Sequence, residues 1–272
     1  NSGGGQIFVG VADDGSISLF VGGSQALVLG INSGQLSVEE TKEYPGSQRM
    51  ALYFSQPGGQ QLELTAAMVG GGEIAGLLKF RNEDLAEGRN LLGRLAMTIG
   101  HELNLQNQRG LTLNGQQGGA LFALPTTSTG YGNITGYSNI GPGAATTQVM
   151  DASKLKPSEY RLIFEGSPVA PVLTRMSDGK VFNATSTSPL TFYADGLRFT
   201  VPNATTAAAV AGNSMLFKPF STVASDIQAL VHNPDELAVA SALTANINKD
   251  NQGTLQLSAL GANSFADIPA PD

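Results

Sequence analysis

The sequence predicts an α+β fold, mainly antiparallel β, with one long amphipathic helix and a second domain that resembles a β-sandwich or barrel. Three observations lead to this prediction. Residues 72–114 contain no proline, and over about 84–109 their apolar residues recur at helical spacing. The segments on both sides alternate apolar and polar residues in short runs that end in Gly, Pro, Asn or Asp. Charged residues make up only 14% of the chain, and its 34 glycines suit a β-rich protein with many turns.

The segment before the helix is predicted to form antiparallel strands. Residues 6–29 alternate on both sides of Asp13-Asp14-Gly15, a sequence that favours the tight turn of a hairpin. Residues 36–43 and 49–54 are expected to form two further strands, with a turn at Pro45-Gly46 between them.

The central helix carries one apolar stripe. Leu92, Leu95, Ala96, Ile99 and Leu103 recur at spacings of three and four, which places them on one face of a helix. We expect this face to pack on a sheet or helix of the first unit. A partner-binding face is the alternative, because a piece of a longer protein would lack the segment that covers the stripe.

The ends of this helix are also marked in the sequence. Residues 73–81 are expected to form a separate helical turn or two. Asn82 or Asp84 is expected to cap the start of the long helix through its side chain. Arg109 and Gly110 are expected to end it, because a cation favours the last turn and glycine tolerates the left-handed conformation.

We predict four units along the chain. Residues 1–130 form an α+β domain with N-terminal hairpins and central helices, and residues 131–148, rich in Gly, Thr, Ser and Asn, form a linker or crossing loop. Residues 149–243 form an all-β outer domain, because short alternating strands there are separated by turns every ~8–14 residues. Residues 244–272 form a return segment to the first domain.

Composition and charge exclude several classes of function. The net charge of −7 argues against nucleic acid and anionic membrane surfaces, both of which attract clustered Lys and Arg. The chain has no cysteine, which excludes disulfides and thiolate catalysis. His101-Glu102 begins like a zinc-protease motif, but Leu105 occupies the position of the second ligand. We therefore predict no catalytic, cofactor-binding or metal-ligating residue, and no enzymatic activity.

A series of motifs runs through residues 71–122. It opens with Gly-Gly-Glu, continues with Gly-Leu-Leu-x-Phe-Arg and Arg-Asn-x-Leu-Gly-Arg-Leu-Ala, and closes with Leu-Asn-Gly and an aromatic residue. This pattern resembles the flagellar hook-associated protein 1 family, the first of the proteins at the junction between hook and filament. The residues expected to carry the family motif or the structure are Gly72, Glu73, Gly76, Leu77, Phe80, Arg81, Arg89, Asn90, Leu92, Leu95, Ile99, Asn104, Leu113, Asn114 and Gly115.

The resemblance implies a structural, non-catalytic subunit of the bacterial flagellum that joins hook to filament. Such proteins are exported unfolded through the flagellar secretion channel, without a cleavable signal peptide, and act outside the cell. The implied partners are the hook protein, the second junction protein and further copies in a ring, together with an export chaperone for the full-length chain. Polymerisation in this family rests on helices at the two chain termini.

Those terminal helices are not expected in this chain, because residues 1–30 start in strands and residues 246–272 have no heptad pattern. The chain also starts at Asn1 without Met or a signal-peptide pattern, which predicts an excised or processed piece. No run approaches the ~18 apolar residues of a transmembrane helix. We therefore expect a monomer that binds neither nucleic acid nor membrane.

Two alternatives stay open at this point. The β domain could be a surface-exposed binding module, or adhesin, that recognises a host molecule or glycan, which the low charge and Thr/Asn-rich loops allow. A clustered aromatic platform on residues 160–220 would favour binding, and inward-facing aromatic side chains would favour a purely structural role. An enzyme of unfamiliar type is the third possibility.

Overall fold

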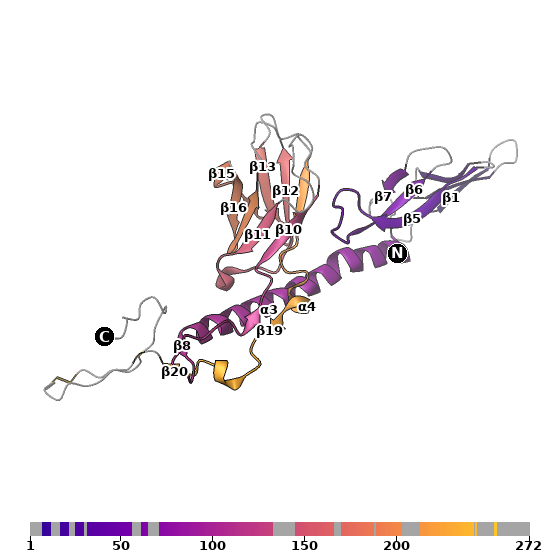
Figure 1. Ribbon diagram of the computed structural model, residues 1–272. Helices are drawn as coiled ribbons and strands as arrows, with labels where there is room; N and C mark the ends of the chain where they lie inside the picture. The colour runs from indigo at the N-terminus through magenta and orange to yellow at the C-terminus, as the bar shows by residue number, and fades with distance from the viewer. Residues whose placement is uncertain are drawn as a thin grey trace.

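The computed structural model describes residues 7–11, 17–21, 25–29, 32–55, 61–64, 71–132, 145–165, 170–187, 189–202, 213–241, 243 and 253–254. One long helix runs through the molecule, and antiparallel sheets lie beside it (Figure 1). A small sheet unit lies near the first residues of the helix, and a large curled sheet lies over its middle (Figure 1). This mixed, mainly antiparallel architecture confirms the predicted fold class.

The N-terminal strands form two small sheets. The first is a four-stranded meander of β1 (Ile7–Val11), β2 (Ile17–Val21), β3 (Gln25–Leu29) and β4 (Asn32–Ser33). The second contains β5 (Gln35–Glu40), β6 (Met50–Ser55) and β7 (Gln61–Leu64).

Both predicted strand pairs form in these sheets. β1 and β2 pair antiparallel with Ile7 opposite Val21, as a hairpin requires, while the predicted turn at Asp13-Asp14-Gly15 lies outside the described residues. β5 pairs with β6, and residues 41–49 join them through a turn in which Gly46 adopts a φ of 81°.

The helix begins earlier than its apolar stripe. It consists of α2 (Glu73–Lys79), a π-helical turn (Phe80–Asp84) and α3 (Leu85–Gln108), which follow one another without a break. The prediction of a long helix over about 84–109 is confirmed. The predicted side-chain caps are wrong: Asp84 is itself helical and makes no capping hydrogen bond, and the Asn82 side chain is bonded elsewhere. Since the chain is already helical from Glu73, residues 82–84 have no free helix start to cap.

The predicted stop is in place, for a different reason. α3 ends at Gln108, and Arg109 follows it. Gly110 does not adopt a positive φ, so the left-handed ending was a wrong expectation. Glycine is needed there because a Cβ atom would overlap the carbonyl group of Ala238, which passes directly over it.

The large sheet has nine strands in the order β14-β13-β12-β18-β10-β11-β17-β16-β15. It curls into a half-barrel, so that β14 and β16 come into contact from its two ends (Figure 1). Its strands are β10 (Thr127–Tyr131), β11 (Thr146–Val149), β12 (Tyr160–Glu165), β13 (Ala170–Arg175), β14 (Val181–Phe182), β15 (Ser186–Thr187), β16 (Leu190–Ala194), β17 (Leu197–Val201) and β18 (Ser214–Phe217). β10 and β11 belong to this sheet, which therefore begins before residue 149; the division of the chain into four units stays a prediction.

Aromatic side chains fill the inside of the half-barrel. Phe199 lies between Tyr160 and Phe217, with ring centroids 4.9 and 5.2 Å away in tilted and edge-on geometry. Met97 of α3 is fully buried in the same cluster, which joins the helix to the core of the sheet.

After β18 the chain returns along the helix. The short helix α4 (Val223–Asp226) lies against α3, and a 3-10 turn (Pro234–Glu236) follows (Figure 1). Two short strand pairs complete the return: β19 (Gln228–Ala229) with β9 (Phe122–Ala123), and β20 (Ala240–Ser241) with β8 (Gly110–Leu111).

A buried polar network closes one end of the half-barrel. The Tyr160 hydroxyl donates to Asp195 Oδ2 over 2.8 Å, and Arg175 Nη1 donates to the same oxygen over 2.7 Å. Burial, and then the hydrogen bond to the Asp195 carboxylate, raise the pKa of Tyr160. A phenol with a raised pKa stabilises the folded state fully below its unfolded pKa of about 10, and this contribution is lost as the pH rises above that value.

Tyr160→Phe is therefore expected to cost about 1 kcal/mol near pH 7, the usual contribution of one hydrogen bond. The same substitution should reduce the loss of stability between about pH 10 and 11, where the tyrosine ionises in the unfolded chain. Urea unfolding of both proteins at a series of pH values measures the two slopes. Parallel slopes would mean that Tyr160 does not govern the alkaline transition.

Candidate functional site

Two regions are candidates for a functional role. The first is the helix α3 with its two faces. The second is the junction where residues 41–49 meet the helix and the nine-stranded sheet. The buried face of α3 consists of glycine and asparagine residues and one methionine, namely Asn90, Gly93, Met97, Gly100 and Asn107. A Cβ atom on Gly93 would overlap the carbonyl oxygen of Phe220, and one on Gly100 would lie 2.8 Å from Leu124 Cδ2. Because glycine in a helix interior costs about 1 kcal/mol relative to alanine, close packing is the reason for both.

Two asparagine side chains of α3 hold the segments that return along it. Asn104 Oδ1 accepts from the backbone N–H groups of Leu121 and Phe122, and its Nδ2 donates to the Phe122 carbonyl, over 2.8 to 2.9 Å. Asn107 Nδ2 donates to the Gly119 carbonyl over 2.9 Å, and its Oδ1 accepts from Ala238 N over 2.8 Å. Each amide uses both its donor and its acceptor, so the contacts fix the position of the neighbouring backbone.

Asn104→Ala is expected to lower the free energy of unfolding by about 1–2 kcal/mol, because it leaves partly buried backbone groups without partners. Asn104→Asp keeps both acceptor contacts but places a carboxylate oxygen against the Phe122 carbonyl, so a loss similar to that of Asn104→Ala is expected. Asn114→Ala, in an exposed turn, is the control and should stay within about 0.5 kcal/mol of the unchanged protein. Chemical unfolding of the three variants measures this order, and equal losses at positions 104 and 114 would contradict it.

The apolar stripe of α3 lies on the opposite side and is exposed. The side chains of Leu92, Leu95, Ile99 and Leu103 are 61%, 51%, 51% and 42% exposed. The prediction that this face packs on the first unit is therefore wrong. The sheet and the returning segments contact the glycine, methionine and asparagine face, which permits a closer approach of backbone to backbone. In the described structure Ala96, also part of the predicted stripe, is partly buried against the core cluster, whereas the four larger side chains are exposed.

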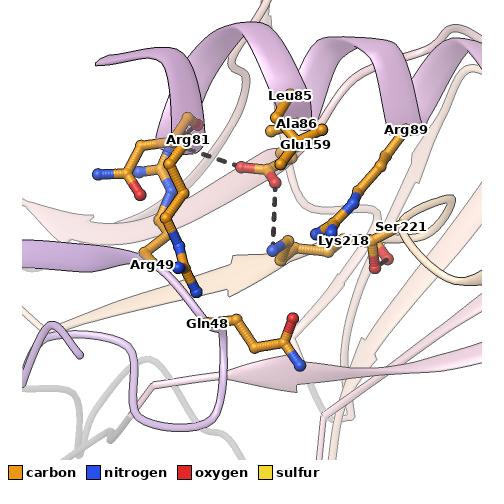
Figure 2. A pocket seen from close by; sticks show the side chains of 10 residues that line it. Gln48, Arg49, Arg81, Leu85, Ala86, Arg89, Glu159, Lys218 and Ser221 are labelled. Carbon is orange, nitrogen blue, oxygen red and sulfur yellow. Dashed lines mark hydrogen bonds and ion pairs between the residues drawn. The ribbon is translucent and has the colours of Figure 1, made fainter. Parts of the chain in front are cut away.

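The second candidate surface has a buried carboxylate at its centre. Glu159, directly before β12, forms ion pairs with Arg49 over 3.5 Å and with Lys218 over 3.7 Å. The side chains of Glu159 and Lys218 are only 6% and 10% exposed, and that of Arg49 is 25% exposed. Figure 2 shows the two ion pairs beside the helix, from which Arg81 and Arg89 also line this cavity of about 160 Å³.

Hydrogen bonds attach residues 41–49 to both neighbours. Lys218 Nζ donates to the Ser47 carbonyl over 2.8 Å, and the Ser214 hydroxyl donates to Glu43 Oε1 over 2.8 Å. On the helix side, Asn82 of the π-helical turn accepts from Met50 N over 3.0 Å and donates to Met50 O over 2.7 Å. The Asn82 amide thus pairs with the first residue of β6 as a neighbouring strand would.

Burial lowers the pKa of Lys218, the nearby Glu159 carboxylate opposes this shift, and the positive charges of Arg49 and Arg89 add to it. In the cavity itself, Arg49, Arg81, Arg89 and Lys218 surround the Glu159 carboxylate, so the charge there is positive on balance. The junction holds three parts of the chain together, and the Ser214 hydroxyl next to the Glu43 carboxylate is one of the links between β18 and residues 41–49. Among the described residues, no group of three or more His, Asp or Glu side chains is arranged to hold a metal ion. No helix in the same residues is long and apolar enough to cross a membrane.

The structure spreads the predicted motif residues along the whole helical segment instead of gathering them at one site. Gly72, with a φ of 89°, precedes α2, and Gly115, with a φ of 71°, lies in a turn with Leu113 and Asn114 beyond α3. Asn90 is buried on the sheet side, Asn104 binds the returning chain, and Arg81 and Arg89 line the junction cavity. The remaining predicted residues have exposed side chains or backbone, namely Glu73, Gly76, Leu77, Phe80, Leu92, Leu95 and Ile99.

Sequence analysis missed the junction residues Asn82, Glu159 and Lys218. Asn82 was assigned to a helix cap. A usable signal existed for the other two: each is a charged residue directly beside a strand whose residues are mostly apolar, and such a charge needs a partner when it is buried.

Comparison with known proteins places the chain in a family. Residues 5–122 match the flagellar hook-associated protein FlgK helical domain, and residues 135–219 match the flagellar hook-associated protein 1 D2-like domain. The flagellar hook-associated protein 1 of Salmonella typhimurium is 30% identical over 237 residues, which is 86% of this chain and 40% of that protein. The Escherichia coli K12 protein of the same name is 26% identical over 269 residues, 96% of this chain and 47% of that protein.

A solved structure agrees with these matches. The flagellar hook junction protein FlgK from Burkholderia pseudomallei superposes with a TM-score of 0.70 at 26% identity, covering 87% of this chain and 42% of that one. The chain thus spans less than half the length of the relatives that it matches. Two family domains in the expected order, relatives of one name and a shared fold lead to one conclusion: the chain belongs to the flagellar hook-associated protein 1 family of structural flagellar proteins.

Proposed function

We propose that this chain is the central and outer part of an axial subunit that joins hook to filament, and that the stripe of α3 receives helical segments of the same protein. The observation that carries the proposal is the exposure of Leu92, Leu95, Ile99 and Leu103 on a helix whose opposite face is packed. An amphipathic helix with an uncovered apolar stripe is typical of a helix bundle from which partners are missing.

Two further observations support a helical occupant. The family that matches residues 5–122 is described as a helical domain, whereas α2, the π-helical turn and α3 are the helical part of the described residues in that range. The chain also covers only 40% to 47% of its curated relatives, which leaves ample length for further helices. The subunit acts outside the cell, and helices beyond this chain contact the other axial proteins. An export chaperone binds the full-length protein.

The arrangement of aromatic side chains favours this structural role over that of an adhesin. Tyr160, Phe164, Phe192, Phe199 and Phe217 are fully buried inside the half-barrel. Most aromatic side chains of these strands thus face inward and stabilise the sheet, while Tyr193 is 53% exposed and lines a surface pocket with Phe182. A structural role also fits a site in which the conspicuous polar contacts join segments of chain.

The test introduces a charge into the stripe, once in this chain alone and once in the full-length protein. Leu95→Asp in this chain alone is expected to change the free energy of unfolding by no more than about 0.5 kcal/mol, as at other exposed positions. In the full-length protein the same substitution should destabilise the helical region and abolish binding to isolated hooks, measured by circular dichroism and co-sedimentation. Gln106→Asp, exposed on the same helix, is the matched control and should leave both unchanged.

Sedimentation velocity of the unmodified chain completes the experiment. A monomer that does not bind hooks is expected, because the assembly contacts lie in segments outside it. Self-association of the chain, or equal tolerance of Leu95→Asp in both lengths of protein, would contradict the proposal.

A further inference from the structure

The junction cavity has an unusual charge balance. Arg49, Arg81, Arg89 and Lys218 surround it, and Glu159 is the one carboxylate among the residues that line it. The cations come from three separate parts of the chain: the residues before β6, the helix, and the residue after β18. With about 160 Å³, the cavity exceeds several times over the ~10–15 Å³ that one water needs, so a small ion enters without movement of the chain.

The partners of these cations are unevenly distributed. Arg49 and Lys218 already contact the Glu159 carboxylate, which neutralises it. Arg81 and Arg89 form no ion pair or hydrogen bond with the residues that the structure describes, and Arg49 Nε is buried without a partner. Figure 2 shows Arg89 extending from the helix toward Lys218 and Ser221, into the space between helix and sheet. The cavity therefore holds excess positive charge and unused donors.

We propose that this cavity binds a small tetrahedral oxyanion of the phosphate class, held between the arginines of the helix and Lys218 of the sheet. Guanidinium groups match the oxygen atoms of such an anion through paired, charge-assisted hydrogen bonds. Donors that lie on opposite walls favour a tetrahedral dianion over a carboxylate, whose two oxygen atoms lie in one plane.

A bound oxyanion would link the helix to the sheet and to the loop of residues 41–49. Ligands that bind the folded state alone raise its stability in proportion to ligand concentration and affinity. The inference is independent of the role of the apolar stripe, since none of the stripe residues lines this cavity.

Isothermal titration calorimetry of the whole chain with inorganic phosphate, at constant ionic strength set with potassium chloride, tests the site. Saturable binding of one phosphate and a rise in melting temperature are expected. Arg89→Gln should weaken phosphate binding at least about tenfold, equivalent to about 1.4 kcal/mol, and Arg81→Gln should act in the same direction. Lys79→Gln removes one positive charge from an exposed position on α2, outside the cavity, and should leave the affinity unchanged.

Three results would overturn the proposal. The first is no saturable phosphate binding by the folded chain. The second is an equal loss of affinity in Arg89→Gln and Lys79→Gln, which would mean that phosphate binding depends on the net charge of the protein and not on this cavity. The third is acetate binding as tightly as phosphate, which would make the cavity a site for a carboxylate. Both arginines are exposed, so their replacement leaves the fold intact and keeps the comparison valid.

Discussion

Glu159→Ala is expected to lower the free energy of unfolding by about 3 kcal/mol, because it leaves the other members of a buried ion pair without their counter-charge. Lys218 is affected most: its side chain is 10% exposed, and its ammonium group would keep the Ser47 carbonyl but lose the carboxylate. The loss lies at the lower end for buried pairs, since Arg49 is 25% exposed and regains water. Urea unfolding at neutral pH measures it.

The variant Glu159→Gln shows how much of the stability loss comes from the charge of the side chain and how much from its size. The amide keeps the size of the side chain and one acceptor oxygen, so a smaller loss of about 1–2 kcal/mol is expected. Because the junction joins residues 41–49 to the sheet, Glu159→Ala should also increase proteolysis between residues 41 and 49. A loss below about 0.5 kcal/mol for Glu159→Ala, the range of surface substitutions, would mean that the carboxylate does not hold the junction together.

Gly93→Val is the second change with a large expected effect. A Cβ atom there overlaps the backbone carbonyl of Phe220, which cannot move aside as the end of a flexible side chain would. Valine would force α3 away from the sheet and disturb Met97, which is fully buried one turn further along. We expect a loss of about 3 kcal/mol, near the upper end for overpacking of a core.

Gly88→Val provides the matched control for this substitution. Gly88 lies on the same helix, and a Cβ atom there meets nothing within 4 Å. Its replacement should be neutral or stabilise by up to about 0.5 kcal/mol, because valine is a better helix former than glycine. Thermal unfolding of both variants distinguishes a close approach at Gly93 from a general effect of valine, and equal melting temperatures would contradict the packing described for α3.

The helix shows which structural features could be predicted from the sequence and which could not. Its length and its amphipathic character follow from the local spacing of leucine and isoleucine, and both were predicted. The prediction of which face packs was wrong. An apolar stripe indicates a helix face that is buried in some assembly, but the stripe does not identify the segment that buries it. Here the backbone at Phe220 packs on Gly93 and the side chain of Leu124 packs on Gly100, because both glycines lack a side chain, and the leucines stay exposed.

The junction could not be predicted for a related reason. Arg49, Glu159 and Lys218 lie far apart in the sequence and meet only because two sheets and a helix are assembled around them. Nothing in the local sequence of Asn82 distinguishes a cap from a side chain that pairs with β6. Arg81 and Arg89 did lie within the predicted motif, but their shared cavity depends on the same long-range arrangement.

The order of strands in the large sheet has a consequence for where this chain tolerates a change of length. The chain leaves the helical region through β10 and comes back through β18, and these two strands are hydrogen-bonded neighbours, with Gly130 opposite Phe217. Everything between them is therefore an insertion between two adjacent points of one scaffold. The outer turns of such an insertion can lengthen or shorten, while Glu159 and the buried cluster around Met97 tie its base to residues 41–49 and to the helix. Added or removed residues in those outer turns are therefore expected to leave the geometry of α3 intact.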